Sequence, residues 1–461
     1  MRGRWGAVSS SLIAFACAGR EPAPLAPDDG SEVAPTAMPT AEPARRAAAA
    51  ADSVVASALA TVERRRELRS KGAIKGRTIE RAEMVAFVKK QLADEIPAPI
   101  VRAQTELLFA LGVVPENFDY EESLLELMGT QLAGFYDPKQ KTMFLSRDLP
   151  PLEREATLAH ELVHALQDQH YDLEKLIKFR EDATDQQSAL HALAEGDATS
   201  AMLDHVLAVR GLRATDVSDE AVALEVRGSI ELSAAAVNVP TILKRSVVSP
   251  YVDGLIFVNG LRRRGGWAGV DAVWRDPPAT TEQLLHPEKH AKREAAEQVP
   301  LPAAPRGGPT EVMYRDVLGE QSLRLLFEEW MPRRAAVESA ADWAGDRMVL
   351  FRAGERFALV WHTRWDDEKS ALRGTQAFAR GVLRPKDAKP GEFVALDRAR
   401  AALKRDRACT ERAAQGPIAV ARSGRDVTMV AGPFERTASG ARSAGTCAEA
   451  LVWAVAVAKQ R

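Results

Sequence analysis

The feature that most constrains the fold of this 461-residue chain is a pair of histidines four positions apart in an apolar segment. The run His160-Glu161-Leu162-Val163-His164 lies inside residues 157–166, where most other side chains are aliphatic. Apolar residues on every face predict a buried helix, and residues four apart on a helix share one face at about 5–6 Å. Burying two imidazoles and a carboxylate without partners would cost several kcal/mol for each group. The segment therefore predicts a helix on which both histidines bind one metal ion.

A catalytic zinc site needs a third protein ligand and one position open to water, and the sequence offers two candidates for that ligand. His170 lies ten positions after His160, the spacing of the metzincin proteases. In that motif a glycine turns the chain back to the metal, but Gln167, a good helix former, stands there instead. On a continuous helix His170 would lie about 15 Å along the axis from His160, out of reach. The second candidate is Glu195, in a helix predicted over residues 186–209.

The combination of H-E-x-x-H with Glu195-Gly196 on a second apolar helix resembles the gluzincin metallopeptidases. In those proteins the second helix supplies a glutamate ligand, so the resemblance implies one Zn²⁺ per chain held by His160, His164 and Glu195. Glycine costs about 1 kcal/mol against alanine inside a helix. Gly196 is therefore expected where two helices approach closely over the shared ion. The resemblance covers residues 134–207.

Three further polar residues are predicted to hold the metal-binding imidazoles in one tautomer, namely Asp168, His191 and Asp197. Each of them has an alternative interpretation as an ordinary surface or helix-pairing residue. Upstream, aromatic and branched residues flank Asp137-Pro138 and predict a β-hairpin over residues 134–145. The family logic makes its strand 142–146 the edge along which an extended substrate pairs.

The resemblance implies hydrolysis of peptide bonds in polypeptides by metal-activated water, with Glu161 as the general base. A neighbouring donor then stabilises the developing oxyanion. His286, in the proline-bounded segment 277–290, is the predicted donor, with Tyr251 and His290 as alternatives. The segment also has a plainer interpretation as a capped surface turn.

Two other functions remain open from the sequence. One is a non-catalytic surface lipoprotein that keeps zinc for stability and binds a partner. The other is a different H-E-x-x-H hydrolase that acts on small amides. The hairpin before the histidine helix favours the peptidase over both.

The amino terminus predicts export. Two arginines, an apolar stretch and small residues form the layout of a signal peptide over residues 1–17. Ala14-Phe15-Ala16-Cys17 resembles a bacterial lipoprotein signal box, which implies lipidation of Cys17 and a membrane-anchored protein facing the periplasm or the cell exterior. Ordinary cleavage after Ala16-Cys17-Ala18, giving a secreted protein, is the alternative. The proline-rich composition that follows predicts a disordered tether over residues 18–50.

Charge and hydropathy argue against binding to nucleic acid and against a membrane-spanning helix. Lys and Arg number 62 against 64 Asp and Glu, so the net charge of −2 gives no attraction to nucleic acid or anionic lipid. No stretch reaches the roughly 18 apolar residues of a membrane-spanning helix. The predicted membrane contact is therefore the N-terminal lipid alone.

The predicted fold class is α+β, with a mainly helical zincin-like core, a small mixed sheet and a small C-terminal α/β extension. The catalytic region is predicted over residues 51–305. A helix with a two-stranded packing module follows over 306–395, and a hairpin with a helix over 396–461. Cys409 and Cys447 are the predicted disulfide, which suits export. Two free buried thiols are the alternative.

Overall fold

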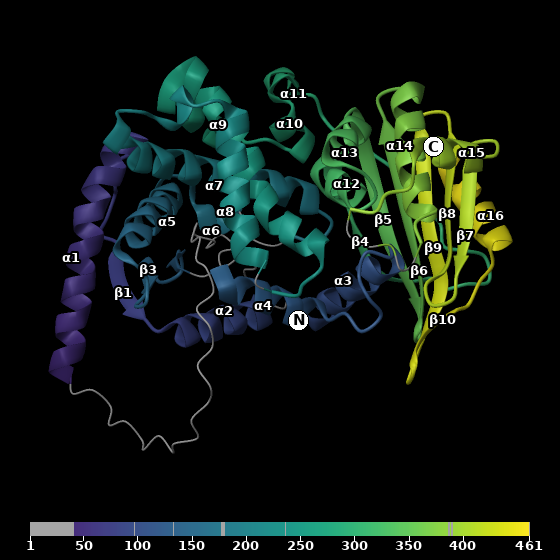
Figure 1. Ribbon diagram of the computed structural model, residues 1–461, viewed down its shortest axis with the longest axis horizontal. Coiled ribbons are helices and arrows are strands. Elements are labelled where there is room, and N and C mark those ends of the chain that lie inside the picture. The colour runs from purple at the N-terminus through teal and green to yellow at the C-terminus, as the bar shows by residue number, and fades with distance from the viewer. Residues whose placement is uncertain are drawn as a thin grey trace, which may run out of the picture.

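The computed structural model describes residues 41–95, 97–131, 133–176, 180–235, 237–385, 388 and 391–460. A mainly helical N-terminal region with a small sheet is followed by a C-terminal region built on a larger antiparallel sheet (Figure 1). The predicted α+β class is confirmed. The predicted signal peptide, Cys17 and the tether up to residue 40 lie outside the described residues. In the part of the chain that is described, no helix has the length and apolarity to cross a membrane.

The helical region packs around α5, which carries the two histidines. One apolar core joins α5 to α1, α7 and α9 through residues such as Val55, Leu162, Leu193 and Val258. The helices of this region are α1 (Ala41–Arg66), α2 (Arg81–Glu95), α3 (Ala98–Ala110), α4 (Tyr120–Gln131), α5 (Pro151–Tyr171), α6 (Leu173–Leu176), α7 (Thr184–Leu207), α8 (Asp219–Ala235), α9 (Thr241–Arg275), α10 (Thr281–Leu285) and α11 (Pro287–Lys292), with short 3-10 turns at Ala208–Arg210 and Ala214–Asp216.

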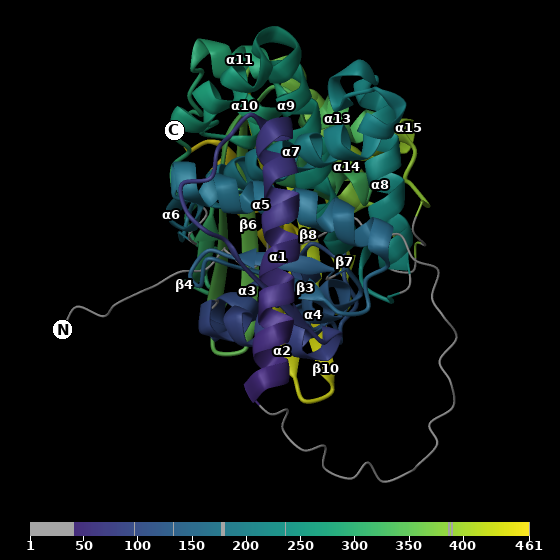
Figure 2. The same cartoon turned by 90° about the vertical axis from the view of Figure 1, so that its left-hand side faces the viewer.

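Helix α1 corrects the predicted tether, which was expected to continue to residue 50. The helix begins at Ala41 and runs along the outer side of the helical region (Figure 2). Residues 47–51 are all alanine, the residue with the highest helix propensity. Val55 and Val62 then bury the helix against the core. The prediction of disorder over residues 41–50 rested on their low hydrophobicity. It was wrong because their helix propensity and the apolar positions that follow favour a helix.

The small sheet has the order β1-β3-β2, with β1 at Lys75–Ile79, β2 at Gly134–Asp137 and β3 at Thr142–Ser146. The antiparallel β2–β3 pair confirms the predicted hairpin, with Phe135 opposite Phe144. Strand β3 was expected at the edge of the sheet, but β1 pairs with it in parallel and makes it the central strand. Because β1 comes from residues far from the hairpin in sequence, no local pattern showed that it occupies this edge.

The larger sheet has the order β4-β5-β6-β9-β8-β7, and β10 pairs with β9. Its strands are β4 (Glu311–Asp316), β5 (Trp343–Ala353), β6 (Arg356–Trp365), β7 (Arg407–Arg412), β8 (Gly416–Ser423), β9 (Asp426–Thr437) and β10 (Gly440–Ser443). Strand β6 pairs with β9, so the segments predicted as two separate modules share one sheet. The hairpins β5–β6 and β8–β9 are local, whereas the pairing that joins them is not.

Alternating side chains of the larger sheet face two layers of helices. Met348 and Leu350 belong to the core shared with α12 and α14, whereas Val349 and Phe351 pack with α16. The helices of this region are α12 (Gly319–Glu328), α13 (Arg333–Ala340), α14 (Glu368–Val382), α15 (Leu396–Ala402) and α16 (Cys447–Ala458). In Figure 1, α16 lies on the opposite side of the sheet from α12 and α14.

The C-terminal region holds two helices of the helical region. At the start of α7, the amide of Thr184 donates to Asp316 Oδ1 at 3.1 Å, and the amide of Asp185 donates to the Val317 carbonyl at 2.9 Å. In the middle of α9, Asp253 forms a buried ion pair with Arg324 of α12 at 2.6 Å. Helices α7 and α9 are thus positioned from outside their own core.

Arg66, at the end of α1, is a buried clamp between the same two helices. Its guanidinium donates to Asp197 of α7 at 2.5 Å and to Asp271 of α9 at 2.7 Å, and it lies over the Trp267 ring. Trp274 Nε1 donates to the other oxygen of Asp197 at 2.8 Å. The charge of Arg66 therefore compensates a carboxylate that is fully buried two residues after Glu195.

We expect Arg66→Met to lower the free energy of unfolding by about 3–5 kcal/mol, because it leaves the Asp197 carboxylate buried without its counter-charge. Urea denaturation followed by circular dichroism measures the change. The matched control is Arg69→Met, since Arg69 pairs with Glu63 at the surface and is 81% exposed. Equal losses in the two variants would contradict the clamp.

Candidate metal centre

Helix α5 presents both histidines of the motif and ends beyond His170. It starts with Pro151 at its first position and ends at Asp172, whose φ of 56° is left-handed. The helix therefore continues through Gln167 without the turn that a metzincin needs. His170 Nε2 lies 2.7 Å from the Arg69 carbonyl oxygen, away from the other two histidines. This placement removes His170 as a third ligand.

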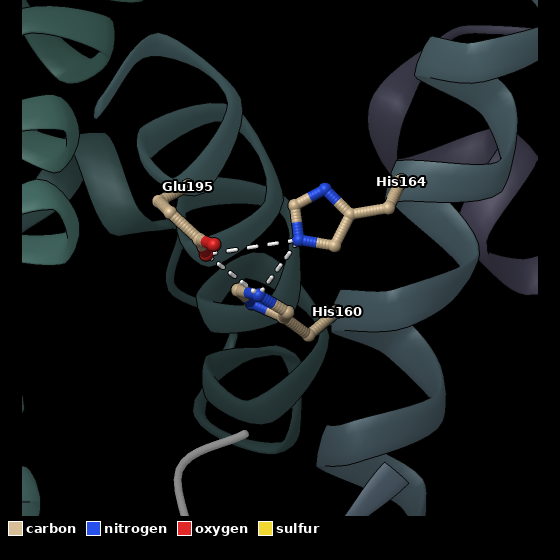
Figure 3. A group of neighbouring side chains, drawn as sticks. All are labelled: His160, His164 and Glu195. Carbon is tan, nitrogen blue, oxygen red and sulfur yellow. Dashed lines mark hydrogen bonds and ion pairs between the residues drawn. The ribbon is translucent and has the colours of Figure 1, made fainter. Parts of the chain in front are cut away.

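The structure brings His160, His164 and Glu195 together across α5 and α7 (Figure 3). Glu195 Oε2 lies 3.1 Å from His160 Nε2 and 3.6 Å from His164 Nε2, and the two Nε2 atoms are 3.1 Å apart. Ligand atoms of a tetrahedral zinc ion, with bonds of about 2.0–2.1 Å, lie about 3.3 Å apart. All three side chains are at most 2% exposed. Two imidazoles and one carboxylate in this arrangement form a buried metal site that fits zinc.

The charges in this cluster favour a cation between the three side chains. Burial acts against ionisation of Glu195, but the charge of His164 and hydrogen bonds from the histidines outweigh it and hold the pKa of Glu195 below its usual range. Burial acts to lower the pKa of His164, but the Glu195 carboxylate raises it to about 9. Burial lowers the pKa of His160. The ionised carboxylate thus stabilises positive charge at a position that both imidazoles face.

Glu161, the predicted general base, lies beside the cluster on α5. Its Oε2 accepts the backbone N–H of Tyr136, in strand β2, at 3.1 Å. Its Oε1 has no hydrogen-bond partner within the described ranges. Complete burial, the largest cause, raises the pKa of Glu161 to about 8. The group therefore holds a proton near neutral pH more readily than an exposed glutamate does.

Of the three residues predicted to orient the imidazoles, His191 alone contacts a metal ligand, and that ligand is Glu195. His191 Nε2 lies 3.2 Å from Glu195 Oε1. Asp168 instead accepts hydrogen bonds from the Tyr136 hydroxyl and Lys141 Nζ, and Asp197 binds Arg66. Both carboxylates face away from the cluster because each compensates another buried or half-buried donor.

The partner of His164 is Gln167, which the sequence interpretation treated only as a helix former. Gln167 Oε1 lies 2.8 Å from His164 Nδ1, and Gln167 Nε2 donates to the Ala194 carbonyl at 3.0 Å. The spacing of three positions on one helix was the available local signal. No local sequence signal indicated the hydrogen bond to Ala194, which lies on another helix.

Among the candidate oxyanion donors, Tyr251 lies nearest to the metal ligands. Its ring stacks against that of His160, with centroids 5.9 Å apart. His286 Nε2 lies 2.9 Å from Glu320 Oε1 on α12, and His290 Nε2 lies 3.1 Å from the Asp276 carbonyl. The contacts of the latter two histidines are thus with groups other than the metal ligands.

Tyr251 reaches this position because α7 and α9 are in backbone contact. A Cβ atom on Gly196 would lie 2.1 Å from the Gly254 carbonyl carbon, and one on Gly254 would lie 1.8 Å from the Ala192 oxygen. The close approach expected at Gly196 is therefore between α7 and α9, not between the two ligand-bearing helices. It brings α9 against the turn of α7 that holds Glu195.

Comparison with known families agrees with this geometry. Residues 122–195 match the IrrE N-terminal-like domain. This is a zincin-like H-E-x-x-H metalloprotease domain, and the matched range ends at the glutamate of the cluster. Residues 310–442 match a domain of unknown function, DUF8575, and include six strands of the larger sheet and part of β10.

Other comparisons add little. No curated protein matches the chain. Among solved structures, a protein of novel fold from Chloroflexus aurantiacus, provisionally called a hydrolase, is similar at 17% identity, with a TM-score of 0.33. The similarity covers 55% of this chain and 92% of that one. A similarity this low carries no argument about the fold or the function.

We expect Glu195→Ala to weaken zinc binding by more than the roughly 10–100-fold typical of losing an outer partner, because it removes a direct ligand. Competition with a chromophoric chelator measures the dissociation constant. His170→Ala is the control, because its imidazole bonds to the Arg69 carbonyl. Wild-type affinity in Glu195→Ala together with weak binding in His170→Ala would contradict the assignment.

Proposed function

We propose that this protein is a zinc-dependent endopeptidase of the gluzincin type, which hydrolyses peptide bonds in polypeptides. The observation that carries the proposal is the buried cluster of His160, His164 and Glu195, with Glu161 directly after His160 on α5. Three protein ligands leave one coordination position for water or substrate, which is typical of catalytic rather than structural zinc.

Zinc, when bound, supplies Lewis-acid activation of water and of the scissile carbonyl. Glu161 takes the proton of that water and returns it to the leaving amine. The Tyr136 amide fixes Oε2 of Glu161, which leaves Oε1 to carry the proton. Burial raises the pKa of Glu161, which makes its ionised form a stronger base toward the proton of the water.

The substrate is proposed to bind along β2 rather than β3. Within the described residues β2 has one sheet neighbour, whereas β3 has two. The Tyr136 N–H points to Glu161 instead of to β3, so the outer side of β2 faces the catalytic helix. An extended polypeptide that pairs with this side by main-chain hydrogen bonds would pass close to the metal. Such pairing favours polypeptides over small amides.

Tyr251 is the proposed oxyanion donor in place of His286. A phenol O–H donates a hydrogen bond without a change of charge, and its ring already lies against His160. His286 is engaged by Glu320, which raises the pKa of His286 through their hydrogen bond. A role for His286 in joining α10 and α11 to α12 agrees better with these contacts.

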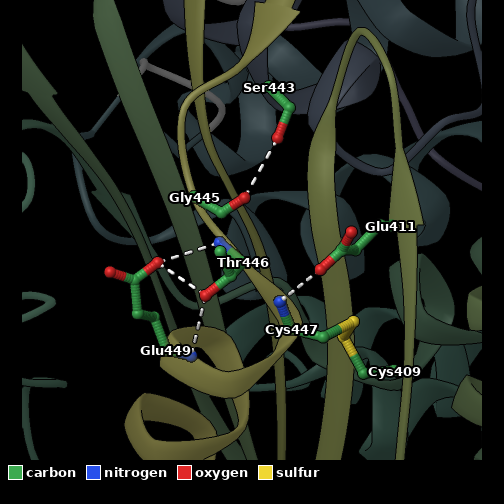
Figure 4. The surroundings of a disulfide bond; sticks show 7 residues. All are labelled: Cys409, Glu411, Ser443, Gly445, Thr446, Cys447 and Glu449. Atoms are coloured by element: carbon green, nitrogen blue, oxygen red, sulfur yellow. Dashed lines mark hydrogen bonds between the residues drawn. A yellow bond between two sulfur atoms is a disulfide. The ribbon is translucent and has the colours of Figure 1, made fainter.

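Export is proposed from the amino-terminal sequence, with Cys17 as the lipidated residue and no nucleic-acid partner. A disulfide between Cys409 of β7 and Cys447 of α16 supports this proposal (Figure 4). Disulfides persist in oxidising compartments and are rare in the cytosol. Next to the disulfide, the backbone amide of Cys447 donates a hydrogen bond to the side chain of Glu411, which lies on β7 together with Cys409, at 3.0 Å.

We expect Glu161→Gln to lower the rate of peptide hydrolysis by about 10²–10⁴-fold while one zinc per chain is retained, because the general base is lost and the ligands remain. Cleavage of an unfolded protein and metal analysis are measured together. Glu155→Gln, at an exposed position of the same helix, is the matched control. Full activity in Glu161→Gln excludes the assigned base. If the wild type binds zinc but cleaves no polypeptide, the result favours a protein that keeps zinc for stability. If it then hydrolyses small amides, the result favours an amidase.

We expect Tyr251→Phe to lower kcat by about 10²–10³-fold with little change in zinc content, the usual loss for one oxyanion donor. His286→Gln should leave kcat close to that of the wild type, because its partner is Glu320. Steady-state kinetics on a fluorogenic peptide distinguish the two variants. The reverse order of effects would restore His286 as the donor.

A further inference from the structure

We propose that Gln167 is a positioning residue of the metal centre, which sets the tautomer of His164 and ties that imidazole to the helix carrying Glu195. The inference rests on the proposed zinc site and assigns it a residue outside the ligand set. Gln167 lies one helical turn after His164 on α5 and is fully buried.

The hydrogen bonds of the Gln167 amide determine its orientation. A backbone carbonyl can only accept, so the amide end that faces the Ala194 oxygen at 3.0 Å must be the NH₂ group. The amide oxygen therefore faces His164 Nδ1, at 2.8 Å, as an acceptor. Nδ1 must then carry the proton in the neutral, metal-binding form of the ring, which leaves the Nε2 lone pair of His164 directed toward Glu195 and available to a cation. One carbonyl on α7 thus fixes the tautomer of a ligand on α5.

The same amide also relates the two ligand-bearing helices to each other. Ala194 immediately precedes Glu195, so the bond from Gln167 joins α5 and α7 at the turn that supplies the carboxylate ligand. His160 has no equivalent support, since its Nδ1 lacks a hydrogen-bond partner among the described residues. Loss of the Gln167 side chain would therefore leave the orientation of the His164 ring unfixed. It would also remove the hydrogen bond that holds α5 next to the turn of α7 carrying Glu195.

A purely structural role for Gln167 makes a different prediction. A buried amide that only joins two helices would contribute to stability and leave metal affinity unchanged. A variant that keeps only one of the two hydrogen bonds of Gln167 distinguishes the positioning role from the purely structural role. Gln167→Met removes both bonds with little change of volume, whereas Gln167→Glu keeps an acceptor for His164 and loses the donor to Ala194.

Zinc affinity of the full chain is measured by chelator competition, together with the visible absorption of the Co²⁺-substituted protein and the melting temperature. We expect Gln167→Met to weaken zinc binding by about 10–100-fold and to alter the Co²⁺ spectrum. Gln167→Glu should bind zinc nearly as tightly as the wild type. Both variants should melt at a lower temperature, because both lose the bond to Ala194.

Gln169→Met is the matched control on the same helix. Its side chain bonds to the backbone of Lys71 and Gly72 at the surface, so its loss can change the melting temperature but not zinc affinity. Wild-type zinc affinity in Gln167→Met would overturn the inference, and so would equally weak binding in the Met and Glu variants. A wild type that binds no zinc would overturn the proposed function itself, and the inference with it.

Discussion

The burial of Glu195 between two imidazoles is the interaction on which the rest of this structure depends. An ionised carboxylate in an apolar core is costly unless hydrogen-bond donors or positive charge face it, and here Oε2 of Glu195 lies 3.1 Å from His160 Nε2 and 3.6 Å from His164 Nε2. The helix that carries Glu195 is surrounded by α1, α5 and α9. Each neighbour supplies one kind of support: the ligand histidines from α5, the Arg66 clamp from α1 and the close glycine contact from α9.

The C-terminal region belongs to this arrangement and is not a separate attachment. Its sheet and α12 bind the first turn of α7 through Asp316 and the middle of α9 through Arg324. Asp253, the partner of Arg324, lies two residues from Tyr251 and one from Gly254. Packing of the larger sheet therefore bears on the position of both the carboxylate ligand and the tyrosine beside His160. The helical region and the larger sheet are therefore one structural unit at these contacts.

The environment of the cluster differs on its two sides. On one side, Gln167 and Ala194 hold His164 through a neutral amide, and His191 holds the outer oxygen of Glu195. On the other side, Glu161 and the edge of β2 meet at a single amide hydrogen bond. The first side is built to keep the ligands still. The second contains the groups that, in the proposed function, exchange protons and meet substrate.

Local spacing was sufficient for several parts of this protein. The two histidines had to share one face of a helix, and the resemblance to the gluzincin metallopeptidases identified Glu195, on a second apolar helix, as their partner. The Asp137-Pro138 turn determined the β2–β3 hairpin in the same way, because turn chemistry and strand alternation act over a few residues. The class of the fold and the metal ligands therefore followed from the sequence by itself.

Tertiary structure alone decided the remaining features, because each depends on residues far apart in the chain. Strand β1 takes the edge of β3 from residues 75–79, and β6 finds β9 across about sixty residues of sequence. Tyr251 reaches His160 only because Gly196 and Gly254 let two backbones touch. Asp168 and Asp197, near the ligands in sequence, are turned away by Lys141 and Arg66, whose positions no local pattern encodes. The pairing of the two histidines is set by helical periodicity, whereas the surroundings of the ligands are set by which helices pack against each other.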